Sequence, residues 1–167
     1  MKKFFIIFFL FSFFFSNLSL SAERIVYLDL DFILSNSNKG KLILSNLENL
    51  NKKNVETLKL KENLIKKEED ELIKQKNIIS NEAYNDKVKK LRNKIQILRE
   101  EKNKLANNFT EERKTKINEF FKIIDKVLRE YVENNSIDLV LNKKDILIGK
   151  NNYNITDEIL KIVNELK

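Results

Sequence analysis

The sequence predicts a mainly α-helical protein with a small α+β body, in which a long antiparallel helical hairpin projects as a coiled-coil arm from a short-stranded β oligomerisation body. The 167 residues include no proline and two glycines, so few positions interrupt a helix. Charged residues make up 34% of the chain, above the roughly 25% of an ordinary globular domain, which favours exposed helices over a large core. Apolar residues recur at helical spacing through the middle, and short β-branched segments lie near both ends.

Residues 1–22 have the pattern of a cleaved secretory signal. Two lysines follow the first methionine, residues 4–15 are apolar except for Ser12, and small residues allow cleavage after Ser21 or Ala22. An uncleaved membrane anchor is the alternative, but the apolar run is shorter than the ~20 residues that a spanning helix needs. Export to an envelope compartment follows in either case.

Three short segments are predicted to be strands, at residues 25–28, 137–141 and 146–148. The last two are predicted to form a hairpin around the polar turn 142–145. A sheet this small has exposed apolar edges, and self-association is the simplest way to cover them. The residues expected to form this oligomerisation surface are Ile25, Tyr27, Leu139, Leu141, Ile146 and Ile148.

Between the strands lie more than 90 residues with a coiled-coil pattern. In the first half, apolar residues recur every seven positions. The second seam position of each heptad, three residues further on, is mostly polar, as at Asn54, Lys61, Glu68 and Gln75. The second half is more regular, and only Lys102 interrupts its seam. The seam positions are Leu44, Leu47, Leu58, Ile65, Leu72 and Ile79 in the first half, and Tyr84, Val88, Leu91, Ile95, Leu98, Leu105 and Phe109 in the second.

A reversal near residues 77–81 is predicted to divide this segment into two antiparallel helices, from about Lys39 to Asn77 and from Asn81 to Asn135. The register changes here, and Ser80 is a good helix N-cap. A single uninterrupted helix is the alternative. At 1.5 Å per residue the first helix would extend on the order of 60 Å.

The base of the second helix, residues 117–135, has an apolar stripe wider than a coiled-coil seam and is predicted to pack into the body. The body comprises residues 23–38 and 136–167, and the arm comprises 39–135. The final helix is expected to begin with Thr156 as its N-cap. The apolar stripe consists of Ile117, Phe120, Phe121, Ile123, Ile124, Val127, Leu128, Tyr131 and Val132.

The order of these elements resembles that of the Skp/OmpH periplasmic chaperones. A first strand ending at Asp29 is followed by a short segment that ends in Ser37 and Gly40 before the first long helix. The tip sequence 78–83 and the closing segments 138–142 and 154–159 are also similar to the family. The resemblance covers essentially the whole mature chain and implies a homotrimer that acts in the periplasm as an ATP-independent chaperone for unfolded outer-membrane β-barrel proteins.

Positive charge is concentrated where that resemblance places the arm. Residues 52–104 carry 16 Lys or Arg and 10 Asp or Glu, and the rest of the mature chain is close to neutral. The arm is therefore expected to attract unfolded clients weakly and over many contacts, and an anionic membrane surface is a further candidate partner. The candidate client-binding residues are Lys66, Lys67, Lys74, Lys76, Lys87, Lys89 and Lys90, with Leu60, Leu64, Ile73 and Ile78.

Other function classes have less support. The chain has no Cys and no His, and no catalytic residue, metal site or cofactor is predicted. Asp29-Leu30-Asp31 matches the Asp-x-Asp of haloacid-dehalogenase-like phosphatases, but no repeated strand–helix units follow it. A sequence pI near 9.4 permits nucleic-acid contacts, although an exported protein meets little nucleic acid in vivo. A structural coiled-coil adaptor of the envelope shares every pattern and remains the main alternative.

Overall fold

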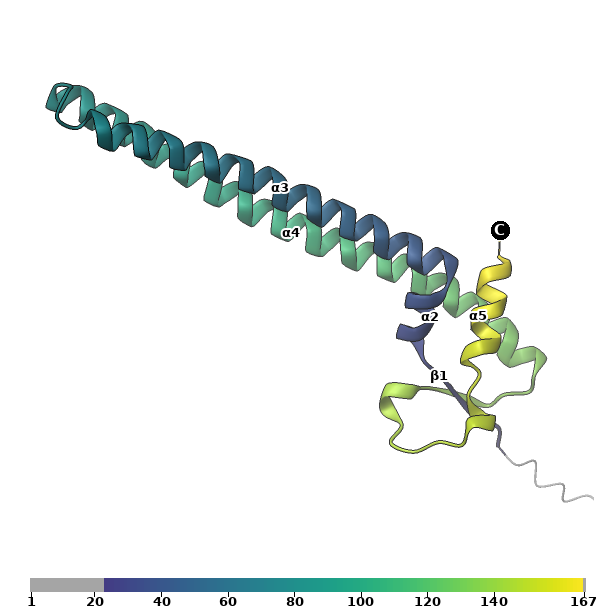
Figure 1. Ribbon diagram of the computed structural model, residues 1–167. Helices are drawn as coiled ribbons and strands as arrows, with labels where there is room; N and C mark the ends of the chain where they lie inside the picture. The colour runs from purple at the N-terminus through teal and green to yellow at the C-terminus, as the bar shows by residue number, and fades with distance from the viewer. Residues whose placement is uncertain (1–22, 167) are drawn as a thin grey trace, which may run out of the picture.

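The structure is a computed structural model that describes residues 23–166, so the predicted signal lies outside the described residues. The helical hairpin of α3 (Asn38–Gln75) and α4 (Asn81–Asn134) projects from a small body that holds β1 (Ile25–Leu28), α2 (Leu30–Asn36) and α5 (Thr156–Glu165) (Figure 1). The predicted mainly α fold, with its arm and small strand-containing body, is confirmed.

Side-chain caps set where the two long helices begin. The hydroxyl oxygen of Ser37 accepts a hydrogen bond from the backbone N–H of Gly40, and the hydroxyl of Ser80 accepts one from Ala83. Such caps satisfy backbone donors that have no partner within the helix. The chain reverses between Gln75 and Asn81, as predicted, and α3 with its 38 residues extends about 57 Å.

The core lies where the base of α4 meets the body. Phe120 and Ile124 are 0% and 1% exposed, and they belong to one buried cluster with Val26, Ile33 and Ile159. These residues come from α4, β1, α2 and α5, so the wide apolar stripe at the base of α4 packs against several elements at once. The body therefore fixes the base of the arm, while the distal part of α3 packs only against α4 within the described residues.

The sheet has two strands, and their arrangement differs from the predicted one. β1 pairs with β2 (Leu139–Asn142) in parallel, with Ile25 opposite Leu139 and Tyr27 opposite Leu141. A single parallel bridge joins Tyr27 to Asn154 on the other side of β1.

The predicted third strand at 146–148 and its hairpin are wrong. The chain after β2 enters the 3₁₀ turn η1 (Lys143–Asp145), then an irregular segment, and then a second 3₁₀ turn η2 (Asn151–Tyr153). Tight hairpin turns need residues with positive φ, and the segment Asn142-Lys143-Lys144-Asp145 contains no glycine. Among the described non-glycine residues, positive φ occurs at Ser136, before β2.

The predicted role of Thr156 as a helix N-cap is also wrong. Thr156 is the first residue of α5, and Ile155 occupies the capping position without a side-chain bond. The Thr156 hydroxyl instead donates to Asn154 and accepts a hydrogen bond from the backbone N–H of Asp29. A long-range contact to the end of β1 thus takes up the oxygen that would have capped the helix.

Candidate functional site

Three polar bridges join the two helices of the arm, and we call them the rungs. Lys61 bonds to Glu101, Lys94 bonds to Glu68 at 2.6 Å, and Lys87 donates to Gln75 at 2.5 Å. Each step of seven residues along α3 is matched by a step of seven back along α4. Lys61, Glu68 and Gln75 are three of the four polar residues noted at seam positions in the first half of the arm, and each has a partner across the hairpin.

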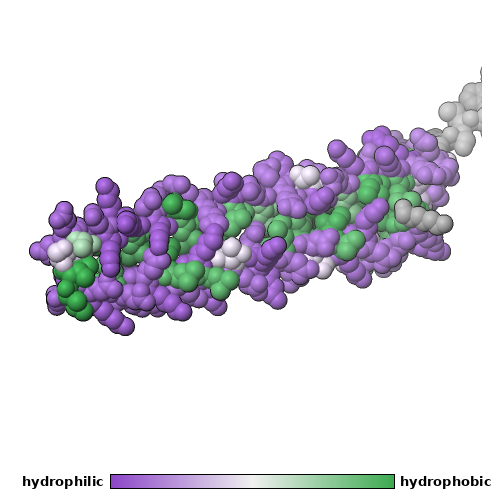
Figure 2. Space-filling model, turned by 90° about the horizontal axis from the view of Figure 1, so that it is seen from above, coloured by the Kyte–Doolittle hydropathy of each residue, from purple (hydrophilic) through white to green (hydrophobic). Residues whose placement is uncertain are grey.

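The apolar seam between the rungs is only partly covered. Leu72 is buried, but Leu58, Ile65, Leu91 and Leu98 are half-buried. Two helices alone cannot enclose a seam from all sides, and no third element packs on the distal arm within residues 23–166. Apolar surface is therefore open to solvent along the arm, where Figure 2 shows hydrophobic patches between hydrophilic margins.

Large apolar side chains outside the seam also face solvent. The four predicted client contacts, Leu60, Leu64, Ile73 and Ile78, have exposed fractions of 67%, 60%, 61% and 78%. A fifth, Ile97, is 54% exposed and was not predicted. Its signal in the sequence is an isoleucine between the seam positions Ile95 and Leu98, where a coiled coil needs no apolar residue.

The seven predicted lysines are all exposed and lie in the distal part of the arm. Lys87 belongs to a rung. The other six take part in no ion pair among the described residues, so their charges face solvent without an acidic partner. These lysines are Lys66, Lys67, Lys74, Lys76, Lys89 and Lys90.

Four of the six predicted body residues, Ile25, Tyr27, Leu139 and Leu141, lie on the side of the sheet that faces away from the core, which we call the outer face, and Tyr27 is only 8% exposed there. The strand register puts Ile25 beside Leu139 and Tyr27 beside Leu141 on this face. A cavity of about 330 Å³ lies against it and is also lined by Ile146. Ile148 of the irregular segment also lines this cavity and is 91% exposed, and its neighbour Leu147 is 99% exposed.

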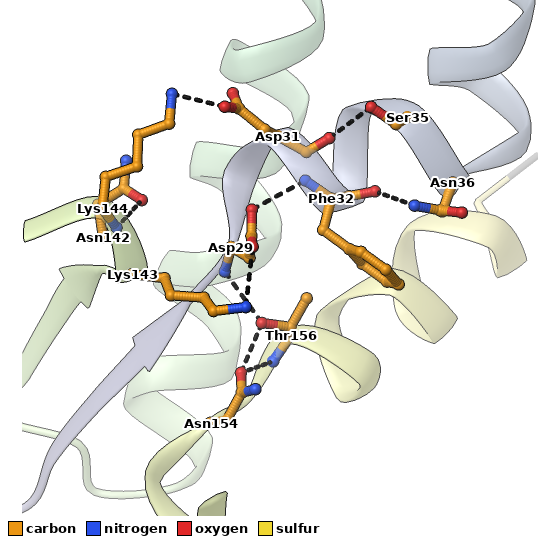
Figure 3. Close-up of polar contacts among 10 residues, drawn as sticks. All are labelled: Asp29, Asp31, Phe32, Ser35, Asn36, Asn142, Lys143, Lys144, Asn154 and Thr156. Carbon is orange, nitrogen blue, oxygen red and sulfur yellow. Dashed lines mark hydrogen bonds and ion pairs between the residues drawn. The ribbon is translucent and has the colours of Figure 1, made fainter. Parts of the chain in front are cut away.

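Asp29 connects the end of β1 to three other elements (Figure 3). Its carboxylate accepts a hydrogen bond from the Phe32 N–H at the start of α2 and one from Lys143 in η1, and its own N–H donates to Thr156 of α5. The Phe32 N–H, helped by Lys143, lowers the pKa of the Asp29 carboxyl below its usual value. This is the chemistry of a helix cap.

The second acid of the Asp-x-Asp motif is also engaged. Asp31 pairs with Lys144 at 2.5 Å, and this hydrogen bond raises the pKa of the lysine. Within residues 23–166, no cluster of three or more acidic side chains is arranged to hold a metal ion. The two aspartates therefore have a structural role: their ion pairs with Lys143 and Lys144 connect the start of α2 to the turn that follows β2.

Comparisons with known proteins agree with this architecture. A family model described as "Outer membrane protein (OmpH-like)" matches residues 24–163. A crystal structure of a candidate outer membrane chaperone (OmpH-like) from Caulobacter crescentus CB15 is similar, with a TM-score of 0.79 and 11% sequence identity. The match covers 86% of this chain and 85% of that one. At this identity the likeness shows a shared fold. A search of curated proteins gave no significant match.

Proposed function

Because the chain belongs to the OmpH-like family of outer membrane proteins, we propose that it is an ATP-independent periplasmic chaperone that holds unfolded outer-membrane β-barrel proteins and prevents their aggregation. Export would follow from the signal pattern at residues 1–22. Among residues 23–166, no helix has a stretch apolar enough to cross a bilayer.

The arm is the observation that carries this proposal. Its distal part offers five exposed large apolar side chains beside six lysines that have no ion-pair partner in the described residues. Charges of this kind act over a Debye length of about 8 Å at physiological salt, so they increase the rate of encounter more than they fix a bound pose. Scattered apolar contacts then hold the client weakly, which suits release without ATP.

We further propose that the outer face of the sheet is a self-association surface and that the chain is a homotrimer. The support for self-association is an apolar face on a sheet of only two strands, next to the exposed Ile148, and the number of three copies rests on the resemblance to the Skp/OmpH family. Such a face costs free energy in water unless something covers it. Three copies joined at their bodies would surround a client with several arms.

An anionic membrane surface is a second partner that the tip of the arm would fit. Residues 72–92 contain six Lys or Arg and two acidic residues, and Ile73 and Ile78 are exposed among them. Basic residues near an anionic bilayer contribute about 1 kcal/mol each, and apolar side chains add to this by entering the interface. Nucleic acid is not a proposed partner in vivo.

The test is the aggregation of a urea-denatured outer-membrane barrel protein, diluted with and without the mature chain at low and high salt. We expect suppression at both concentrations, with faster binding at low salt. A variant with Lys66, Lys67, Lys89 and Lys90 changed to Gln should lose most of the salt dependence. The control changes four exposed lysines near the base, Lys39, Lys41, Lys122 and Lys126, to Gln. No suppression by the wild-type chain at either salt concentration would favour a structural adaptor and overturn the proposal.

A further inference from the structure

A groove lies between α3 and α4 in the middle of the arm, and we call it the mid-arm groove. Leu64 of α3 and Ile97 of α4 border it, with exposed fractions of 60% and 54%, and the half-buried Ile65 and Leu98 line it deeper in the seam. Its volume is about 240 Å³. The structure describes every residue of α4, and Ile97 is the one large apolar residue of this helix that is exposed. Two helices thus contribute unpartnered apolar side chains to the same place.

The two ends of the mid-arm groove are closed by rungs. The Lys61–Glu101 pair lies at one end and the Lys94–Glu68 pair at the other. One heptad separates these rungs, which corresponds to about 10 Å along the arm. Each of these two rungs joins a cation to an anion, so the rims offer hydrogen-bonding groups but little net charge. The groove therefore has an apolar centre between two polar, electrically balanced borders.

We propose that the mid-arm groove is a subsite for one large apolar side chain of an unfolded client bound in extended conformation. This inference rests on the proposed function and names the part of the client that the arm takes. The groove is open to solvent, and its volume of about 240 Å³ exceeds the ~150 Å³ of a cavity that holds benzene, so an aromatic or aliphatic side chain has room to lie in it. An extended chain advances about 3.3 Å per residue. Some three residues therefore span the distance between the rungs, with peptide groups near both.

Other occupants fit the mid-arm groove less well. A stable contact with a second copy would bury about 800 Å² on each partner, far more than two side chains provide. An anionic lipid surface requires cations that are free to approach it, whereas Lys61 and Lys94 are already paired with glutamates. Strands of outer-membrane barrels alternate apolar and polar side chains, so an unfolded barrel protein presents single apolar residues between polar ones.

The first experiment measures the affinity of the full mature chain for a urea-denatured outer-membrane barrel protein after dilution. In the groove variant, Leu64→Gln is combined with Ile97→Gln. In the matched control, Leu42→Gln is combined with Val55→Gln, two arm residues that are 62% and 55% exposed, lie outside the groove and are not among the proposed client contacts. We expect the groove variant to raise the Kd about fivefold, as partial loss of one apolar burial predicts, and the control to change it less than twofold. Circular dichroism should give the same helix content for both variants.

The second experiment uses the absence of cysteine from the chain. Ile97→Cys and Val55→Cys are each labelled with a solvatochromic dye, and the client is then added. The fluorescence at position 97 should shift to the blue while that at position 55 does not. Equal Kd losses in the two double variants, or equal dye shifts, would overturn the subsite while leaving the holding function intact. A shift at position 97 with anionic phospholipid vesicles but not with the client, or with protein concentration alone, would also overturn it. Failure of the wild-type chain to bind the client would overturn the holding function and the subsite together.

Discussion

Gly40 lies where the first turn of α3 passes the end of α2. A Cβ atom at this position would be 1.9 Å from the carbonyl oxygen of Leu34, which is backbone and cannot swing aside. Alanine normally stabilises a helix interior relative to glycine by up to about 1 kcal/mol. Here we expect the opposite sign, with Gly40→Ala lowering the free energy of unfolding by about 1–3 kcal/mol, as overpacking does.

Thermal unfolding of the mature chain measures this change. Gly149→Ala is the matched control, because its Cβ would lie 2.8 Å from the ring of Tyr27, a longer contact than the 1.9 Å at Gly40 and one to a side chain rather than to backbone. The control should lower the melting temperature less than Gly40→Ala does. A higher melting temperature for Gly40→Ala than for the wild-type chain would contradict the tight contact between the two helices.

Asp29 gives the body a stability that depends on pH. Its pKa is lowered in the folded state from the ordinary 3.8, chiefly by the Phe32 N–H and then by Lys143. A lowered pKa contributes stability that is present above the ordinary value and is lost as the pH falls through the folded pKa. Asp29→Asn keeps a capping oxygen but no charge. We therefore expect the variant to be less stable than the wild-type chain at pH 7, and the difference to shrink below about pH 4.

Chemical unfolding at a series of pH values tests this expectation. Asp138→Asn is a suitable control, because Asp138 accepts a hydrogen bond from the backbone N–H of Arg24 but lies outside the Asp29 contacts. A stability difference between wild type and Asp29→Asn that stays constant from pH 7 to pH 3 would show that the charge of Asp29 is not what stabilises the cap.

At the scale of the element, the rungs explain why α3 tolerates polar residues at positions of its seam. The side chains of Lys94 and Glu68 are 51% and 44% exposed, so their pairing stabilises the arm by less than about 1 kcal/mol. Glu68→Lys should lower the melting temperature slightly by placing two cations together, and adding Lys94→Glu should restore it. High salt should reduce both effects, because these charges are exposed.

A double-mutant cycle on thermal unfolding measures this coupling. The control cycle replaces Glu68→Lys with Glu69→Lys, because Glu69 is exposed and makes no rung among the described residues. Coupling of similar size in the two cycles would mean that general charge attraction holds the arm, and the seven-residue register of the rungs would then carry no information about its stability.

The same elements indicate what a sequence can and cannot predict. The arm follows from local properties, since the heptad positions, the Ser80 cap and the lack of proline all act within a few residues of each other. The parallel pairing of Ile25 with Leu139 joins segments separated by the whole arm, and no local pattern specifies its direction. The rungs could not be recognised before the register was known, because Lys61 and Glu68 differ from ordinary surface residues only through partners on α4.

At the scale of the whole molecule, the arm is anchored at its base and free at its tip. The buried cluster around Phe120 holds the base of α4 in the body, so truncation of this ring should affect the entire protein. The tip contacts no other element among the described residues and can vary without unfolding the body (Figure 1). This division allows the arm to expose apolar groups for a partner while the body alone provides most of the buried core.

If the outer face of the sheet is the self-association surface that we propose, it determines whether one arm or several act on a client. We predict that the mature chain elutes with the mass of a trimer, and that Leu139→Gln combined with Leu141→Gln shifts it to a monomer, because both residues lose their apolar contact on the outer face. Leu42→Gln, at an exposed residue of α3, is the control and should leave the mass unchanged. Light scattering after size exclusion measures these masses.

If arms surround the client together, the monomeric variant should also lose most of its suppression of aggregation, although its arm is unaltered. A monomeric wild-type chain, or a monomeric variant that suppresses aggregation as well as the wild type, would mean that a single arm is the working unit.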